Sequence, residues 1–393
     1  MTPAKTTERQ MAPVDEQLSV LLSGVEYGDD RTHATMEAEL RARLEEDRPL
    51  KVYAGFDPTS VDLHLGHTVP MRKLKQFQQF GHDVTFLIGN FTGLVGDPSD
   101  KAKGRPMLTA EQLAEHGRTY ADQAFRILDG ERTAVRYNAD WLGELTFADV
   151  VRLSSKFTVA QFLERDNFEK RWLNHDAIHL SEFMYAIMQA YDAVMMETDV
   201  QIGGSDQLFN LMAGRTLQRD AGQPPQVVIT LPILVGTDGH ERMSKSTGNS
   251  IGINETANDM YGQVMSLPDH VIPDFYTLVT PVPPDDILHI SEAIEGGTLP
   301  PMKAKKRLAR VIVGVFYDEA AAEAAQKYFE ATIQRQEIPD EMPEYEVDGE
   351  QPLNRVLTGA ELASSGGEVR RLVGQGAVSV NGERVEEFTQ VVR

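Results

Sequence analysis

The sequence predicts an α/β protein built on a parallel sheet, followed by a helical region and a small α+β module. Apolar strands alternate with amphipathic helices in residues 1–252, helical periodicity dominates in 253–336, and residues 352–393 contain a hairpin signal. Alternation of strand and helix is typical of parallel sheets, because each crossover returns the chain to the same edge of the sheet.

The first region begins with a polar arm and one amphipathic helix, both within residues 1–47. Met36, Leu40 and Leu44 are the apolar positions of this helix. Each expected strand is a short apolar run, and these runs are residues 51–56, 82–89 and 227–235. Helices are expected from the end of the first strand to about residue 80 and again between 109 and 128. We therefore predict a Rossmann-like domain over residues 1–252.

The second half of the chain contains three further segments. Residues 253–336 read as a helical domain punctuated by proline-rich turns, and the acidic, proline-containing stretch 337–351 reads as a linker. In 352–393, two short helical pieces precede two β-prone runs that are joined by Asn381 and Gly382. Asn-Gly between two such runs is a strong hairpin signal.

Composition narrows the possible functions. The 393 residues suit two or three domains, and 38 Lys and Arg against 60 Asp and Glu give a net charge of −22. This charge argues against attraction to nucleic acid along the whole chain. The absence of cysteine excludes disulfides and cysteine-bound zinc. No apolar segment is long enough for a signal peptide or a membrane helix, so we expect a cytoplasmic protein without membrane contact.

The first motif with a chemical meaning is His64-Leu65-Gly66-His67, which follows a strand and opens a helix. Its spacing places both imidazoles on one face of the first helical turn. Free N–H groups at a helix N-terminus favour phosphates, and Gly66 allows a ligand to approach the backbone closely. Alone, the tetrad is a weak signal. Two histidines at this spacing can also simply form hydrogen bonds within the protein and bind no ligand.

The second motif, Arg242-Met243-Ser244-Lys245-Ser246, carries two cations and several hydroxyl groups in a short loop. Such a loop can close over a polyphosphate, although basic, hydroxyl-rich loops are often simply solvated. Together, the two motifs resemble the HIGH and KMSKS signatures of class I aminoacyl-tRNA synthetases in order and separation. Leu65 replaces an isoleucine, and Arg242 replaces a lysine with the same charge but a different geometry.

Four further segments narrow the resemblance to the tyrosyl-tRNA synthetases, bacterial type and second subtype, over nearly the whole chain. They are residues 53–59 (YAGFDPT), 91–99 (FTGLVGDPS), 181–192 (SEFMYAIMQAYD) and 201–207 (QIGGSDQ). Tyr185, Gln189 and Asp192 form one polar stripe on an otherwise apolar helix. A stripe of this kind faces solvent or a polar ligand, and the resemblance favours a substrate pocket.

The resemblance implies a set of side chains that bind L-tyrosine. Tyr53 and Asp192 would hydrogen-bond the phenolic hydroxyl, Tyr185, Asp97 and Gln189 would hold the α-amino group, and Gln207 would lie near the carboxylate. Phenylalanine would then leave buried polar groups without partners.

The resemblance also implies the contacts to ATP. Asp57, Gly203 and Asp206 would contact the ribose or the amino group of the adenylate. Gly55 and Gly66 would allow the ligand to approach the backbone closely. The phosphates would be reached by Thr59, Ser244, Lys245 and Ser246. Lys101 and Arg105 resemble mobile cations that cover pyrophosphate, with a solvated basic loop as the alternative.

The implied reaction is in-line attack of the tyrosine carboxylate on the α-phosphorus of ATP, after which the adenylate passes tyrosine to tRNA. Catalysis would rest on positioning and charge stabilisation, without a covalent enzyme intermediate. His64 and His67 would serve the α and leaving oxygens, and the four cations of the two loops would serve pyrophosphate. Mg²⁺ would arrive with ATP, so no zinc, protein-bound metal or tightly bound organic cofactor is expected.

RNA contacts are expected in two places. Residues 352–393 resemble an S4-type RNA-binding domain, in which Arg355, Arg370 and Arg371 are the candidate contacts. A second basic cluster has no acid within its own sequence window: Lys303, Lys305, Lys306, Arg307 and Arg310. Both sets could touch phosphates of tRNA(Tyr), although Lys and Arg also commonly decorate exposed helices. The resemblance further implies an anticodon-side role for 253–336 and a homodimer.

Three other functions stay open from the sequence alone. A synthetase for tryptophan would share both motifs, but Tyr53 and Asp192 suit a phenol better than an indole, whose nitrogen only donates. Another H-x-G-H nucleotidyl transferase would not need the second motif or the RNA-like tail. A non-catalytic RNA-binding relative would be expected to have lost the histidines or Lys245, and all three are present.

Overall fold

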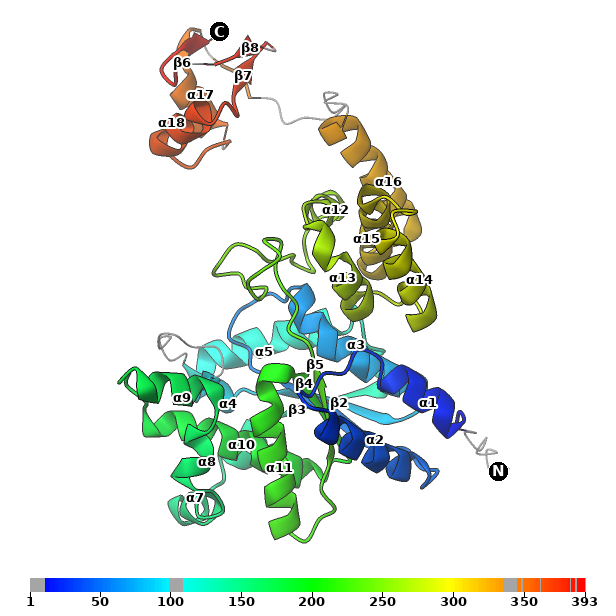
Figure 1. Cartoon of the computed structure of the whole chain (residues 1–393). Helices are drawn as coiled ribbons and strands as arrows, with labels where there is room; N and C mark the ends of the chain where they lie inside the picture. Colours follow the sequence, from blue (N-terminus) through cyan, green and yellow to red (C-terminus); the bar gives the residue numbers. More distant parts are fainter. Residues whose placement is uncertain are drawn as a thin grey trace, which may run out of the picture. The chain divides into compact units, whose positions relative to one another are not determined.

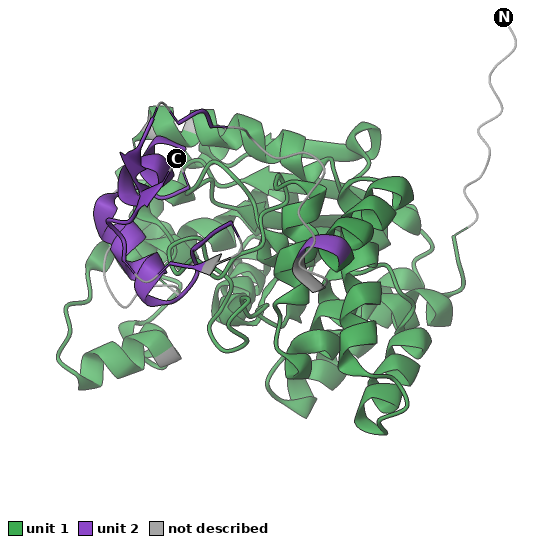
Figure 2. Ribbon diagram, turned by 90° about the horizontal axis from the view of Figure 1, so that it is seen from above, with its two compact units in different colours: residues 1–330 green, residues 331–393 purple. Residues whose placement is uncertain are grey.

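The computed structural model (Figure 1) describes residues 11–98, 109–334, 345–347, 349–360, 362–381, 383–385 and 387–392. Two compact units divide the chain between Glu330 and Ala331 (Figure 2). The predicted boundary at 252/253 falls inside the first unit. In this unit, the helices after residue 252 share one apolar core with the sheet. The structure therefore does not separate 253–336 as a domain of its own, and that boundary stays a prediction.

The first unit is built on a five-stranded sheet with the order β3-β2-β1-β4-β5. Its strands are β1 (Lys51–Phe56), β2 (Asp83–Ile88), β3 (Thr133–Tyr137), β4 (Val200–Gly204) and β5 (Val227–Leu231). All neighbouring strands are parallel, and Val52 of β1 pairs with both Val84 and Val200. The predicted Rossmann-like sheet is confirmed. Because strand order reverses at β1, its carboxyl end is where such sheets bind ligands.

One predicted strand is too long. β5 ends at Leu231, whereas the apolar run 227–235 predicted a single strand. Pro232 follows directly and has no backbone N–H to donate to a ladder, so regular pairing stops there. Val235 instead forms an isolated antiparallel bridge with Arg242, which brings the second motif back toward the sheet.

Helices lie on both faces of the sheet, α3 and α5 on one side and α10 and α11 on the other (Figure 1). These helices are α3 (Leu65–Gln79), α5 (Ala110–Ala124), α10 (Leu180–Met196) and α11 (Leu208–Asp220). The shorter helical elements of this region are α4 (Thr92–Val95), η2 (Gly130–Arg132), α6 (Ala139–Leu142), α7 (Phe147–Ser154), α8 (Val159–Leu163), α9 (Asp166–Leu173) and η3 (Ser205–Gln207).

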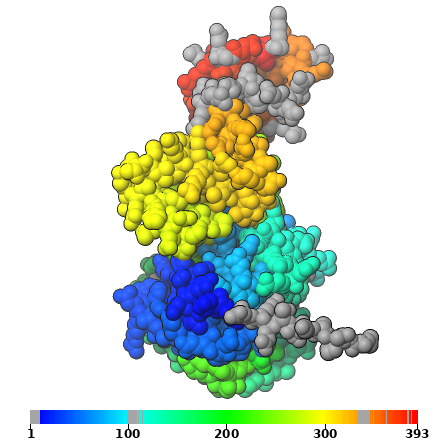
Figure 3. Space-filling model, turned by 90° about the vertical axis from the view of Figure 1, so that its right-hand side faces the viewer, coloured from blue at the N-terminus to red at the C-terminus, as the bar shows by residue number. Residues whose placement is uncertain are grey.

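The N-terminal arm contains two helices, α1 (Val14–Leu21) and α2 (Asp30–Leu44), which form part of the surface in Figure 3. Met36, Leu40 and Leu44 are buried on α2, so the predicted amphipathic helix is confirmed. α2 begins after Asp29, whose carboxylate accepts a hydrogen bond from the N–H of Thr32 as an N-cap. The sequence analysis did not predict α1.

The rest of the first unit is helical, as predicted. Its elements are α12 (Ala257–Met265), η4 (Asp269–Val271), α13 (Ile272–Val279), α14 (Pro284–Glu295), α15 (Pro301–Phe316) and α16 (Glu319–Phe329). A π-helical turn, η5 (Glu330–Gln334), crosses the boundary between the units. α14 and α15 each begin with proline, which is favoured at the first helical position because that N–H has no helical partner. Proline-rich turns therefore separate these helices.

The second unit has a small core of its own, built from Leu353, Val369, Val373, Val378 and Val385. Its elements are β6 (Gln351–Pro352), α17 (Leu353–Gly359), α18 (Gly366–Gly374), β7 (Ser379–Val380), β8 (Glu383–Arg384) and β9 (Val391–Val392). β7 and β8 form the predicted antiparallel hairpin, with Asn381 at a φ of 54° in the left-handed region that its turn needs. Gln351, the last residue of the predicted linker, already belongs to β6.

Within the described ranges, the structure contains no helix with the length and apolar character needed to cross a membrane.

Candidate active site

A cavity of about 610 Å³ opens at the carboxyl ends of β1 and β4, beside the N-terminus of α3. Every described residue that was predicted to bind tyrosine or ATP lines it: Tyr53, Gly55, Asp57, Thr59, His64, Gly66, His67, Asp97, Tyr185, Gln189, Asp192, Gly203, Asp206, Gln207, Arg242, Ser244, Lys245 and Ser246. Lys101 and Arg105 lie outside the described residues. The structure therefore brings together motifs that are up to 193 residues apart in the chain, since Tyr53 and Ser246 border one space.

The two histidines form the first turn of α3 and cap each other's backbone. Nδ1 of His64 accepts from the N–H of Gly66 at 3.2 Å, and Nδ1 of His67 accepts from the N–H of His64 at 3.2 Å. Because both Nδ1 atoms accept, the hydrogen-bond pattern assigns the proton to both Nε2 atoms, which are then donors. The ring centroids are 3.9 Å apart, and a Cβ at Gly66 would lie 3.0 Å from the His64 ring, so only glycine fits without a shift.

Both histidines are neutral at physiological pH. Burial, the neighbouring His67 and the cations Lys245 and Arg242 lower the pKa of His64 to about 2. Burial and Arg242 likewise lower the pKa of His67 to about 4. The pair therefore offers hydrogen-bond donors to an anion rather than positive charge or a general base near pH 7.

Main-chain hydrogen bonds join the two motifs. The N–H of Leu65 donates to the carbonyl of Ile251 at 2.9 Å, and the N–H of Ile253 donates to the carbonyl of Leu63 at 3.1 Å. The segment that follows the second motif is thus paired with the segment that opens α3. This pairing explains why the second motif reaches the same cavity as the histidines.

A buried asparagine holds the base of the second motif. Oδ1 of Asn249 accepts from the N–H of Ser244 at 2.8 Å and from the hydroxyl of Thr247 at 2.7 Å, and Asn249 is only 4% exposed. The N–H of Met243 donates to the carbonyl of Leu234 at 2.9 Å. Lys245 and Ser246 are exposed beyond this base, so the motif is a loop with a fixed base and an exposed tip.

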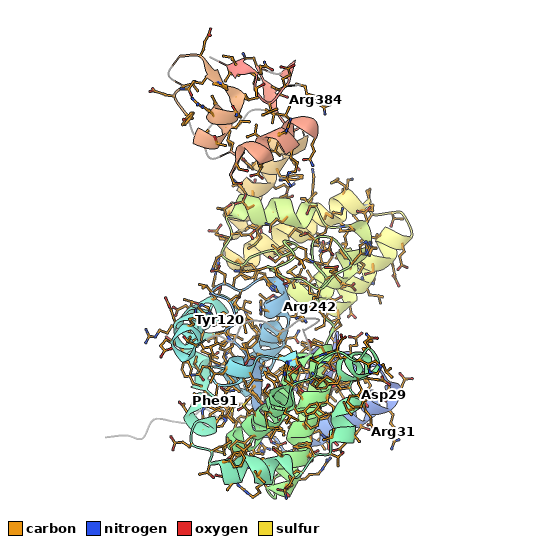
Figure 4. All side chains as sticks on the ribbon, turned by 90° about the vertical axis from the view of Figure 1, so that its left-hand side faces the viewer. Asp29, Arg31, Phe91, Tyr120, Arg242 and Arg384 are labelled. Carbon is orange, nitrogen blue, oxygen red and sulfur yellow. The ribbon has the colours of Figure 1, made fainter. Side chains whose placement is uncertain are left out.

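Both cations of the loop contact carboxylates. Nζ of Lys245 lies 2.9 Å from Oδ2 of Asp62, and Nη1 of Arg242 lies 3.5 Å from Oδ2 of Asp206. Burial and the neighbouring Asp97 raise the pKa of Asp206 to about 6. Figure 4 shows Arg242 beside α3, which agrees with the lowering of the His67 pKa by this guanidinium.

The opposite end of the cavity is buried and polar. Oδ1 of Asp192 accepts from the indole N–H of Trp141 at 2.7 Å, and Oδ2 accepts from the amide of Asn138 at 3.3 Å. Burial raises the pKa of Asp192 to about 8, although the hydrogen bonds from Trp141 and Asn138 lower this pKa. In the described part of the chain, the hydroxyl of Tyr53 and Oε1 of Gln189 are buried without a hydrogen-bond partner. Buried polar atoms of this kind normally have partners, so a ligand that supplies them fits here.

Two carboxylates link this polar end to the phosphate end. The hydroxyl of Tyr185 donates to Oδ2 of Asp57 at 2.9 Å, and the hydroxyl of Thr92 donates to Oδ1 at 2.7 Å. The amide of Gln207 donates to Asp97. Tyr185 was expected to lie beside Asp97 at the α-amino group of tyrosine. In this structure it contacts Asp57, which was expected to contact the adenylate.

Sequence reasoning missed several residues that support the site. Asn138 and Trp141 hold Asp192, Thr92 holds Asp57, and Arg165 lies 3.9 Å from Asp97. A signal existed for Asn138, because it directly follows β3 at the ligand-binding edge of the sheet. Trp141 and Arg165 lie on or before short helices in a long connection, where no periodicity indicates their direction.

The candidate RNA contacts are exposed arginines of the second unit. Arg355, Arg370 and Arg371 are exposed, Arg370 lies 4.9 Å over the ring of Phe388, and Arg371 pairs with Glu368 at 3.1 Å. Arg370 is therefore exposed with its guanidinium lying over an aromatic ring, a cation–π arrangement.

The basic cluster of α15 is less free than its sequence predicts. Lys305 is buried and pairs with Asp269 at 2.7 Å, Lys306 pairs with Glu330 at 2.6 Å, and Arg310 pairs with Glu319. These acids come from neighbouring elements, so the acid-free sequence window was misleading. Lys303, Lys306, Arg307 and Arg310 still border a hollow of about 400 Å³, whereas the buried Lys305 does not line it.

Among the described residues, no group of three or more His, Asp or Glu side chains is arranged to hold a metal ion.

Comparison with known proteins assigns both regions of the chain. The family model for class I tRNA synthetases (W and Y) matches residues 45–334, and the model for the Tyrosine–tRNA ligase SYY-like C-terminal domain matches residues 334–393. Curated relatives named Tyrosine–tRNA ligase include one from Syntrophotalea carbinolica, 45% identical over 96% of this chain and 93% of the relative. Another, from Moorella thermoacetica, is 46% identical over 95% of this chain and 90% of the relative.

Solved structures agree at the level of the fold. A C-terminally truncated mitochondrial tyrosyl-tRNA synthetase from Aspergillus nidulans has a TM-score of 0.63 at 23% identity, covering 82% of this chain and 93% of that chain. A tyrosyl-tRNA synthetase from Archaeoglobus fulgidus complexed with L-tyrosine has a TM-score of 0.63 at 21% identity, covering 80% of this chain and 100% of that chain.

Proposed function

This chain belongs to the class I tRNA synthetases and, within them, to the tyrosine–tRNA ligases, and from that premise we propose how its own residues carry out the reaction. It is an aminoacyl-tRNA ligase, which activates tyrosine with ATP and transfers it to tRNA(Tyr). The relatives favour tyrosine over the tryptophan alternative, because they are named for tyrosine and match nearly the whole chain. The observation that carries the residue assignment is the pair of partnerless buried atoms, on Tyr53 and Gln189, in the cavity that also holds both phosphate motifs.

The buried polar end binds the side chain of tyrosine. A phenolic hydroxyl can donate to Asp192 and accept from the hydroxyl of Tyr53, which supplies the partner that this hydroxyl lacks. Phenylalanine would fill the same space and leave Tyr53 without a partner, at a cost in binding free energy. Gln189, Tyr185 and Asp97 hold the α-amino group next to it.

The phosphates of ATP occupy the other end, near α3. Nε2–H groups of His64 and His67 donate to the oxygens that gain negative charge in the transition state. Lys245 and Arg242 neutralise the departing pyrophosphate, and Asp57, Gly203 and Asp206 contact the nucleoside. Both histidines are neutral, so their contribution is hydrogen bonding and positioning rather than proton transfer.

Magnesium reaches the site with ATP. The cavity offers separate carboxylates, Asp57, Asp97 and Asp206, each already in contact with another side chain. Phosphate oxygens would therefore supply much of the coordination of Mg²⁺, as is usual for nucleotide-bound magnesium.

The second unit binds tRNA through Arg355, Arg370 and Arg371, and the hollow beside α15 offers a further place for phosphates. We propose the cytoplasm as the place of action, because a tyrosine–tRNA ligase must meet tRNA and ATP where it acts.

A homodimer is supported by exposed apolar side chains on the connection between β3 and β4. Phe147 is 84% exposed, Leu180 77% and Trp172 62%, on α7, α10 and α9. Large apolar side chains that are this exposed are typical of an interface between subunits. Sedimentation velocity should show a dimer that Leu180→Asp dissociates. Leu288→Asp, at an exposed leucine of α14, is the matched control and should leave the dimer intact.

The experiment that tests the proposed function is pyrophosphate exchange into ATP, measured with each of the twenty amino acids and without tRNA. Exchange should occur with tyrosine and fall sharply in Asp192→Ala. Exchange with tryptophan would keep the fold and overturn the pocket. If no amino acid supports exchange while tRNA still binds, the catalytic assignment is wrong.

A further inference from the structure

Asp62 is a carboxylate that none of the assigned roles uses, although it contacts a catalytic cation. It lies two residues before His64, and its Oδ2 is 2.9 Å from Nζ of Lys245. The two side chains are 51% and 39% exposed, so the pair lies at the rim of the cavity rather than in its interior. Lys245 in turn is the loop cation assigned to pyrophosphate.

The backbone on both sides of Asp62 is clamped to the body of the protein. Nε2 of Gln123 donates to the carbonyl of Val61 at 2.8 Å, and Oε1 of Gln123 accepts from the N–H of Leu63 at 2.8 Å. Gln123 lies on α5 and is 6% exposed. The hydroxyl of Ser60 also donates to the carbonyl of Asp62 at 3.1 Å. Asp62 is therefore a fixed point beside the site.

Lys245 lies on the exposed tip of the loop, above the base that Asn249 and Met243 hold. The tip is closed by hydrogen bonds within itself: the N–H of Gly248 donates to the carbonyl of Lys245 at 3.1 Å, and the hydroxyls of Ser244 and Ser246 are 2.9 Å apart. The ion pair with Asp62 thus joins the tip of the loop to the fixed body of the protein.

From this geometry, and resting on the proposed function, we propose that Asp62 is a positioning residue that holds Lys245 while ATP is absent. The ammonium leaves Asp62 for the phosphates when ATP binds, because the phosphates present more negative charge than one carboxylate. Breaking the pair opposes ATP binding, so its removal should tighten apparent ATP binding. An ion pair this exposed contributes little, and the expected effect is roughly two- to fivefold.

The test is Asp62→Asn, which keeps the size of the side chain and removes its charge. In tyrosine-dependent pyrophosphate exchange, KM for ATP should fall roughly two- to fivefold, and kcat should not fall. Asp15→Asn is the matched control, because it breaks another exposed pair, Arg41–Asp15 at 2.7 Å, far from the loop in sequence. It should leave both constants unchanged. A raised or unchanged KM in Asp62→Asn, or a lower kcat, would overturn the proposal.

Hydrogen exchange of the amides at 244–248 gives a readout that does not depend on activity. Without ATP, these amides should exchange faster in Asp62→Asn than in the wild type, and ATP alone should reduce the difference. In the Lys245→Ala background, Asp62→Asn should have no effect on them. Equal exchange in wild type and Asp62→Asn would refute the proposal while leaving the proposed function standing. A wild type without tyrosine-dependent exchange would instead refute the function.

Discussion

Asp192 predicts a trade-off between the stability of the empty enzyme and its use of tyrosine. In the folded protein, burial raises the pKa of Asp192 from 3.8 to about 8. Between these two values, the folded state keeps a proton that the unfolded chain has lost. This group therefore contributes stability below pH 4, and the contribution is lost as pH rises toward 8. Asp192→Asn has nearly the same shape and does not titrate, so it should avoid this loss.

The size of the effect follows from linkage. Over this range, the free energy of unfolding of Asp192→Asn should rise relative to wild type by about 1.4 kcal/mol per pH unit, or at most about 4 kcal/mol from pH 5 to pH 8. Urea unfolding of both proteins at whole pH units from 5 to 9 measures this difference. In the same variant, tyrosine-dependent exchange should fall, since Asn has one acceptor oxygen where the carboxylate offers two, to Trp141 and Asn138, and the proposed phenol contact would compete for it.

Asp199 supplies a control of opposite sign. Burial opposes ionisation of Asp199, but hydrogen bonds from Arg48 and Lys51 outweigh it and lower the pKa. Its contribution to stability is present above the unfolded pKa and is lost as pH falls, so Asp199→Asn should destabilise by a constant amount from pH 6 to 9. If the difference between Asp192→Asn and wild type is also flat over this range, the carboxyl of Asp192 titrates normally and the argument fails.

Three other variants test the site at different points. Tyr53→Phe should stabilise the ligand-free protein by about 1 kcal/mol, since it removes a buried hydroxyl without a partner, and should reduce discrimination against phenylalanine; thermal unfolding and exchange with both amino acids measure this. His67→Ala should lower kcat for activation by about 100-fold with little change in KM for tyrosine, and a loss confined to KM would contradict the assignment. Wild-type kcat should show no step between pH 6 and 8 from His64 or His67. Gly89→Ala should raise KM for ATP about tenfold, because its Cβ would lie 2.0 Å from Oδ1 of Asp57, and an unchanged KM would show that Asp57 is not needed there.

The parts of the site that periodicity specifies were predictable from sequence. Tyr185, Gln189 and Asp192 line the cavity because they lie on one stripe of α10, and a spacing of four and three residues on a helix places side chains on the same face. The βαβ order likewise predicted the parallel sheet, since only a crossover connection can join neighbouring parallel strands. Periodicity predicted that the three side chains share one face of the helix, whereas the family resemblance indicated that this face lines a substrate pocket.

Contacts between distant segments were not predictable in the same way. The ion pair of Lys245 with Asp62 joins residues 183 positions apart, and Lys305 is neutralised by Asp269 from another element. No local pattern carries that information, because partner choice depends on how the elements pack. Trp141 was missed for a related reason: its helix has four residues, too few for a period to indicate where the indole points.

The pairing of Leu63 and Leu65 with Ile253 and Ile251 has a consequence for how this enzyme can diverge. Those hydrogen bonds join backbone atoms, which every residue except proline can supply on the donor side. All four side chains are fully buried in the core, so the distance between the histidines and the loop is kept only by apolar substitutions of similar volume. The long connection between them contains β2, β3, β4 and β5 and most of the residues that line the cavity, so insertions and deletions are expected only in its surface loops. We therefore expect the enzyme to diverge at its surface, while the apolar residues that join the two motifs change little.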